Sequence, residues 1–173
     1  MNSELQQKLI KKYPILFQDK DKSATETLIC FGIETGNGWY KILDDLFGYF
    51  YSTMDNEYYV PFEEEYVVKG DVKTYGAYIK APEIKLLQVK SKYATLRVYT
   101  SVYDDDPPSE ELQKKFQDNA YERTLKSIYR KYDFAVDYAE YLSAKTCEVC
   151  GEEGTQTNGS WVETLCPEHM SKK

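Results

Sequence analysis

Four residues near the carboxyl end have the types and the spacing of a metal site. They form a C-x2-C-x15-C-x2-H pattern made of Cys147, Cys150, Cys166 and His169. Three thiolates and one imidazole at this spacing suit tetrahedral zinc, because two intervening residues let a tight turn direct both of its ligands at one ion. Gly151 supplies the positive φ that such a turn often needs. Since four protein ligands leave no position for water, we predict one structural Zn²⁺ per chain rather than a catalytic ion.

The zinc site uses the only histidine of the chain, which limits the chemistry left to other residues. A general base near neutral pH would have to be a perturbed carboxylate, a lysine or the Cys30 thiol. Cys30 lies in an apolar run, and we interpret it as a buried, inert thiol. No nucleophile-elbow, P-loop, metalloprotease or dinucleotide-binding motif occurs. The sequence therefore predicts a protein without catalytic residues. A metal-dependent enzyme acting on a nucleotide or another phosphate-containing substrate stays open as the alternative.

A short glycine-containing turn offers a second place for chemistry. Gly36, Asn37 and Gly38 join a predicted strand to the amino end of a predicted helix, directly before Trp39. Unpaired backbone amides and the helix dipole at such an end can hold an anion. The plainer interpretation is a turn in which Asn37 caps the helix and Trp39 enters the core. The turn is a candidate ligand-binding site beside that interpretation.

Tyrosine is unusually frequent: it makes up 17 of the 173 residues, and many lie between Tyr40 and Tyr103. An apolar ring with a hydroxyl at its tip suits interfaces and base-stacking surfaces. Lys90, Lys92 and Arg97 lie among these rings near a predicted hairpin. Such a face is suited to stack on a nucleotide-like ligand and neutralise it, whereas a solvated strand face is the alternative interpretation.

The charge balance argues against general nucleic-acid binding. The chain has 29 Asp and Glu against 22 Lys and Arg, a formal net charge of −7, which on average repels a phosphate backbone. A nucleic-acid-binding zinc protein is therefore only a further alternative. No uncharged apolar run approaches the roughly 20 residues that span a membrane, and the first residues lack a basic segment followed by an apolar one. We expect a cytoplasmic protein that does not bind membranes.

Hydrophobic periodicity predicts two main helices with strands between them. Apolar residues recur at helical spacing from Trp39 to Phe50, and again after Ser109 as far as about residue 143. Between these segments, β-branched and aromatic runs are broken by Gly, Pro and Ser. This pattern predicts strands at 66–68, 75–79, 84–89 and 96–103.

A short helix and a short strand are predicted before these elements. The helix is capped by Ser3 and ends at Pro14, and the buried strand occupies 28–33. We expect an α+β domain over 1–143, with an antiparallel sheet of three or four strands packed by helices. Over 144–173 we expect a zinc lobe of knuckle or ribbon type, joined to the long helix without a linker.

The long predicted helix carries an apolar stripe with alternating spacings of four and three. We interpret it as the face that lies on the core of its own domain, and a homodimer seam is the alternative. The stripe consists of Tyr121, Leu125, Ile128, Tyr132, Ala135, Ala139 and Leu142.

Three segments together resemble a group of phage and bacterial proteins with no established chemistry. Residues 31–39 are similar to F-G-x-E-x-G-[DN]-G-W in that group, and residues 89–99 to V-K-E-K-F-G-x-L-R-x-Y. Residues 147–169 are similar to C-E-x-C-G-x-x-G followed by G-W-x-x-T-L-C-x-x-H. The chain departs from these patterns at Ser91, Tyr93, Ala94 and Ser160.

The resemblance implies a phage-type origin rather than an activity. It also marks a set of residues to test as a ligand-binding surface: Glu34, Gly36, Trp39, Lys90, Lys92, Arg97 and Tyr99. Together with the residue-based analysis, it leads us to expect a non-catalytic binding protein with a structural zinc. Such a protein would act in the host cytoplasm against a host defence or regulatory system, by binding a host protein or by sequestering a nucleotide signal. The expected action against a host system is an analogy with phage proteins.

Overall fold

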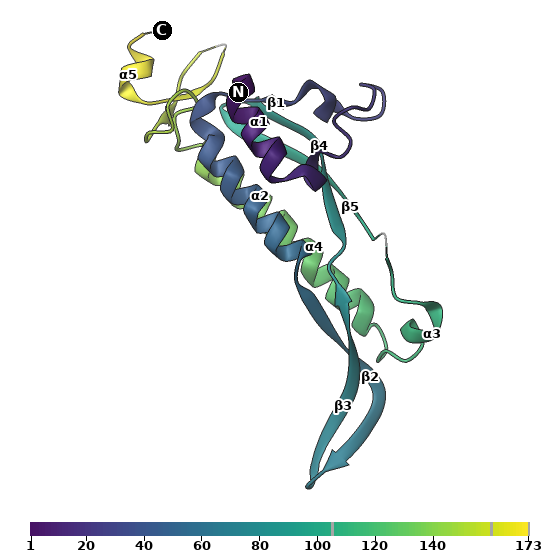
Figure 1. Ribbon diagram of the computed structural model, residues 1–173. Helices are drawn as coiled ribbons and strands as arrows, with labels where there is room; N and C mark the ends of the chain where they lie inside the picture. The colour runs from purple at the N-terminus through teal and green to yellow at the C-terminus, as the bar shows by residue number, and fades with distance from the viewer. Residues whose placement is uncertain (105, 160, 173) are drawn as a thin grey trace.

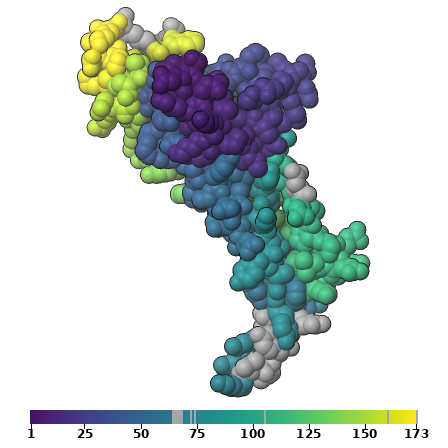
Figure 2. Space-filling view, in the orientation of Figure 1, coloured from purple at the N-terminus to yellow at the C-terminus, as the bar shows by residue number. Residues whose placement is uncertain are grey.

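The computed structural model describes residues 1–104, 106–159 and 161–172, and the side chains of these residues except 64–68, 72 and 74. The molecule is elongated, with the small carboxyl-terminal lobe at one end and a projecting β-hairpin at the other (Figure 1). Two long helices run side by side between these ends. The space-filling view shows the amino-terminal segments gathered beside the carboxyl-terminal lobe (Figure 2). The predicted α+β class is confirmed.

The amino-terminal segment contains helix α1 (Ser3–Lys12), a 3₁₀ helix at Leu28–Phe31 and the short strand β1 (Ile33–Glu34). Asn2, rather than Ser3, caps α1, because the Asn2 side chain accepts the Leu5 N–H. The strand predicted at 28–33 is wrong over most of its length. The Thr27 side chain caps a single 3₁₀ turn, and the chain extends only after Gly32, whose φ of 78° ends that turn.

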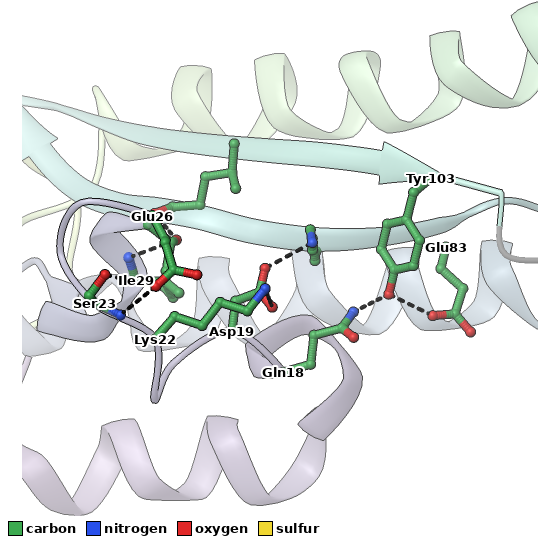
Figure 3. A network of polar contacts seen from close by, with 11 residues as sticks. Gln18, Asp19, Lys22, Ser23, Glu26, Ile29, Glu83 and Tyr103 are labelled. Atoms are coloured by element: carbon green, nitrogen blue, oxygen red, sulfur yellow. Dashed lines mark hydrogen bonds and ion pairs between the residues drawn. The ribbon is translucent and has the colours of Figure 1, made fainter.

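The loop that follows α1 is attached to the sheet through one buried carboxylate. Asp19 is only 7% exposed, and its two carboxylate oxygens bind Lys22 at 2.8 Å and Lys85 at 2.9 Å (Figure 3). These lysines, Lys22 first, hold the pKa of Asp19 below its usual range. Lys85 is therefore engaged in holding the loop.

The long strands form two separate hairpins. Strand β2 (Glu57–Val68) pairs antiparallel with β3 (Asp71–Lys80), and β4 (Glu83–Lys92) pairs antiparallel with β5 (Thr95–Tyr103). The β4–β5 hairpin becomes a three-stranded sheet because β1 adds parallel to β4. Local periodicity predicts strands but does not decide which of them pair, so the division into two sheets was not predictable from it.

The helical region predicted from Ser109 to about residue 143 is interrupted. The Ser109 side chain caps the short helix α3 (Glu110–Gln113), and the long helix α4 (Ala120–Ser143) follows after Asn119, whose φ is 56°. In between, the backbone bonds to β2, with Glu63 N–H donating to Lys115 O and Gln117 N–H donating to Pro61 O, both at 2.9 Å. These bonds break the helix.

The main core lies between α4, the β4–β5 hairpin and helix α2 (Tyr40–Met54). Its largest fully buried side chains include Trp39, Phe47, Phe50 and Tyr132. From the predicted stripe on α4, Ile128, Tyr132 and Ala139 are buried in this core, so their side of the helix is occupied within the chain. The carboxyl-terminal lobe contains strands β6 (Thr155–Gln156) and β7 (Thr164–Leu165) and helix α5 (Pro167–Met170). Among the described residues, no helix is both long and apolar enough to cross a bilayer.

Ser143 joins α4 to the edge of β5 and provides a stability test. Its buried hydroxyl accepts the Leu96 N–H at 2.8 Å and donates to Glu140 O at 2.6 Å. Ser143→Ala leaves the Leu96 N–H buried without that acceptor, so we expect a loss of about 1–3 kcal/mol in the free energy of unfolding. Ser127→Ala, at an exposed position of α4, should change it by less than about 0.5 kcal/mol. Denaturant titration of both variants checks this, and equal midpoints would contradict it.

Candidate metal centre

The four predicted ligands lie together in the carboxyl-terminal lobe. Their donor atoms are all within 4.8 Å of one another. Cys166 Sγ lies 3.1 Å from His169 Nδ1, Cys147 Sγ lies 3.6 Å from the same nitrogen, and Cys150 Sγ lies 3.7 Å from Cys166 Sγ. Around a tetrahedral zinc ion, adjacent donors are separated by about 3.4–3.8 Å, as follows from the zinc–sulfur and zinc–nitrogen bond lengths. The four side chains can therefore hold one metal ion.

Local backbone geometry brings the two ligand pairs into position. The first pair lies on a knuckle in which the Gly151 N–H donates to Cys147 O at 2.9 Å, and Gly151 adopts a φ of 87° as predicted. The second pair lies at the start of α5, where Pro167 occupies the beginning of the helix and His169 follows two residues later. Pairing of β6 with β7 joins the two halves of the lobe.

The lobe prepares one thiol for ionisation before any metal binds. Burial of the Cys147 thiol raises its pKa, but backbone N–H groups of Cys150, Cys166 and Val149 outweigh burial and lower the pKa to about 6. At Cys150 the Glu152 N–H acts to lower the pKa, but desolvation and the Cys147 and Cys166 sulfurs together raise it above its usual value. The lobe thus favours the thiolate form of Cys147, and because zinc binds thiolates, binding of a metal ion at this cluster releases protons.

The glycine turn predicted as a ligand site is packed against this knuckle. The Gly38 N–H donates to Glu148 O at 2.9 Å, and the Gly36 N–H donates to the Glu148 carboxylate at 2.9 Å. A Cβ atom at Gly36 would lie 2.0 Å from Glu148 O, and one at Gly38 would lie 2.1 Å from Cys147 O. Only glycine permits this approach of two backbone segments. The turn is therefore one of the contacts between the carboxyl-terminal lobe and the rest of the chain.

The anion held at this turn is a side chain of the protein itself. The Glu148 carboxylate accepts the Gly36 N–H and, through its other oxygen, the Ser91 hydroxyl at 2.9 Å. The neighbouring residues of the turn are also engaged, because Trp39 is fully buried and its Nε1–H donates to Thr146 O at 2.8 Å. Asn37 does not use its side chain to cap the helix. Its Oδ1 accepts the Asn2 N–H at 2.8 Å.

The other candidate ligand residues lie on the three-stranded sheet. Glu34 of β1 pairs in register with Lys90 of β4, which in turn pairs with Arg97 of β5. The Lys90 ammonium lies 5.5 Å from the centre of the Tyr99 ring. Arg97 forms an ion pair with Glu140 of α4. The structure thus brings Glu34, Lys90, Arg97 and Tyr99 together but leaves Arg97 neutralised.

The tip of the β4–β5 hairpin carries the remaining candidate, Lys92. Its ammonium lies 5.2 Å from the ring of Tyr93, and that ring is 72% exposed. Tyr93 and Ala94 form the turn with φ values of 53° and 63°, a left-handed conformation that is unfavourable for residues other than glycine. Ala94 is fully buried against the metal lobe, and the Thr164 hydroxyl donates to Ala94 O at 2.7 Å. The carboxyl-terminal lobe thus contacts the turn of the β4–β5 hairpin directly.

Sequence analysis missed Glu148, Ser91 and Thr164 as the residues that connect the metal lobe to the sheet. The detectable signal was Glu148 itself, because a carboxylate between two thiolate ligands is unfavourable unless hydrogen-bond donors from elsewhere compensate it. Trp161, which lies in the segment similar to G-W-x-x-T-L-C-x-x-H, is 75% exposed.

Comparison of the chain with protein-family models, with curated proteins and with solved structures gives no match.

The glycine turn provides a test of how the lobe is attached. Gly38→Ala should force the turn away from the knuckle, because the added methyl group would overlap Cys147 O. We expect a loss of at least about 2 kcal/mol in the free energy of unfolding and increased solvent exposure of Trp39. Asn37→Ala is the matched control, because this exposed position already carries a Cβ, and it should cost less than about 1 kcal/mol. Unfolding curves followed by tryptophan fluorescence check both predictions. A Gly38→Ala variant with the stability and the tryptophan emission of the wild type would exclude this attachment of the lobe through the glycine turn.

Proposed function

We propose that this protein is a non-catalytic binding protein whose carboxyl-terminal lobe is built around one structural zinc ion. The observation that carries the proposal is the convergence of four donor atoms of the chain itself, three sulfurs and one imidazole nitrogen, within 4.8 Å. Zinc favours this borderline-soft, tetrahedral donor set, and four protein ligands complete its shell. The bound ion would supply a cross-link between the knuckle and α5. Cys147, Cys150, Cys166 and His169 would hold it.

The surface that we propose for binding is the outer tip of the β4–β5 hairpin. It combines Lys90, Lys92, Tyr93 and Tyr99, and the two tyrosines are 72% and 44% exposed. Exposed tyrosines with neighbouring cations are typical of interfaces that recognise acidic or aromatic groups. Support for a link with the metal comes from the contacts of Ser91 with Glu148 and of Ala94 with Thr164, through which the lobe holds this tip.

The partner that we propose is a protein with an acidic surface. The resemblance to phage proteins supports a host defence or regulatory protein, with a nucleotide signal as the other ligand of suitable charge. Electrostatic complementarity would mainly set the rate and specificity of association. The non-catalytic assignment is supported by the closed donor set and by the engagement of Arg97 and Glu148 in contacts within the chain.

The metal content tests the first part of the proposal. Protein purified without chelator should contain one zinc per chain by native mass spectrometry. Cys150→Ser and His169→Ala should lose most of it to a competing chelator, because a three-ligand site binds far more weakly. Cys30→Ser is the matched control and should keep its zinc, since the Cys30 thiol donates to Thr27 O outside the cluster. Chelation should also speed amide exchange at Ala94. Metal-free wild type, or equal zinc loss in all variants, would reject the structural zinc.

The surface is tested by a double charge reversal at its two lysines. Lys90→Glu with Lys92→Glu should reduce binding of the retained host protein or nucleotide by at least about tenfold, because it replaces two cations with anions. The control is Lys11→Glu with Lys114→Glu, which changes the net charge equally at two exposed positions elsewhere. Native mass spectrometry of wild type and both variants after incubation with host lysate measures retention. Equal retention by the two double variants would exclude this surface.

A further inference from the structure

Helix α4 has a second long face, opposite the one that enters the core. Its residues are mostly exposed and recur at spacings of three and four, so they lie along one side of the helix. We call this set the outer α4 face. It consists of Arg123, Lys126, Ser127, Arg130, Phe134, Asp137, Tyr138 and Tyr141.

The carboxyl-terminal half of the outer α4 face is a row of exposed aromatic rings. Phe134, Tyr138 and Tyr141 are 67%, 53% and 54% exposed. Successive rings are stacked, with centroids 6.3 Å and 6.4 Å apart and interplanar angles of 5° and 20°. Together they offer on the order of 300 Å² of ring surface to a partner. A contiguous exposed patch of this size is often functional.

The amino-terminal half of the same face is basic. Arg123, Lys126 and Arg130 project from it, and none of them forms an ion pair within the part of the chain that the structure describes. Asp137, beside the aromatic row, is likewise without an ion pair there. Three cations thus lie along one side of this half of the helix, in a chain whose net charge is −7.

We propose that the outer α4 face is the interface of a homodimer in which two α4 helices pack antiparallel. With the twofold axis between Arg130 and Phe134, the aromatic row of each copy lies on the basic row of the other. Asp137 of one copy then faces Lys126 and Arg130 of the second copy, on the same side of the helix pair. The face is thus complementary to itself, which is what an isologous interface requires.

Charge selects the antiparallel arrangement and a second copy as the occupant. A parallel pair would place Arg123, Lys126 and Arg130 of one copy against the same residues of the other, and like charges at an interface are unfavourable. In the antiparallel pair each cation meets an aromatic ring or Asp137, and cation–π contacts are favourable when they are desolvated.

The size of the face sets the expected strength of the dimer. Helix α4 has 24 residues, and a helix of that length spans about 36 Å. Standard interfaces bury about 800 Å² on each partner, and one helix face with its flanking residues reaches the lower part of that class. We therefore expect reversible dimerisation in the micromolar range. This face is separate from the hairpin tip proposed for ligand binding, so either proposal can fail without the other.

The test is a charge-swap experiment on the full chain, purified without chelator and studied by sedimentation equilibrium. Wild type should form dimers, whereas Asp137→Lys alone and Arg130→Asp alone should each raise the dissociation constant at least about tenfold, because each places like charges opposite one another. An equimolar mixture of the two variants should restore dimers, since each heterodimer then keeps one native pair of Asp137 with Arg130 and gains one pair in which the two substituted positions carry opposite charges. Native mass spectrometry should identify these as mixed dimers.

Three further variants complete the experiment, two as controls and one as a second test of the face. Glu111→Lys and Lys114→Asp change the charge at exposed positions outside this face, and they should dimerise like wild type. Phe134→Ser with Tyr138→Ser should be monomeric while keeping the circular dichroism of the wild type, because both rings are exposed. Wild type that stays monomeric up to about 300 µM would overturn the proposal. Dimers that persist in both single charge variants would also overturn it, and so would a mixture of these variants that stays monomeric.

Discussion

The whole arrangement depends on how the Glu148 carboxylate is held. This anion lies beside a thiolate-rich knuckle, where a negative charge without hydrogen-bond donors would oppose folding. The Gly36 amide and the Ser91 hydroxyl bind its two oxygens, one from the turn that precedes α2 and the other from the β4–β5 hairpin. One side chain therefore ties the carboxyl-terminal lobe to two segments that are more than fifty residues away in sequence. Gly36 and Gly38 have to be glycines, because their close approach to the backbone of the knuckle leaves no room for a Cβ atom.

The ligand set and the main helices were predictable because both depend on short-range patterns. The spacing of Cys147, Cys150, Cys166 and His169 indicates one site without knowledge of the fold, and helical periodicity locates α2 and most of α4. The docking of Gly36 and Gly38 on the knuckle was not predictable, since no local pattern records a contact across 110 residues. For the same reason the backbone bonds from Glu63 and Gln117, which separate α3 from α4, had no counterpart in the sequence pattern.

Helix α4 shows how one segment can satisfy two different demands. Its inner side carries Ile128, Tyr132 and Ala139 into the core, and sequence periodicity identified that side because burial enforces a regular apolar stripe. Its outer side carries rings and cations that the core does not require. Periodicity alone gave no reason to examine that side, because exposed aromatic residues become informative only when the structure shows that they stack in one row.

The turn at Tyr93 and Ala94 has a consequence for the order of biosynthetic events. Its left-handed backbone costs about 1 kcal/mol or more per residue, and the compensating contacts come from Thr164, about seventy residues later in the chain. During translation the β4–β5 hairpin leaves the ribosome well before Thr164 is made, so its tip cannot yet be fixed in the final geometry. The surface at this tip therefore matures only after synthesis of the last segment, which makes a truncated nascent chain unable to present it.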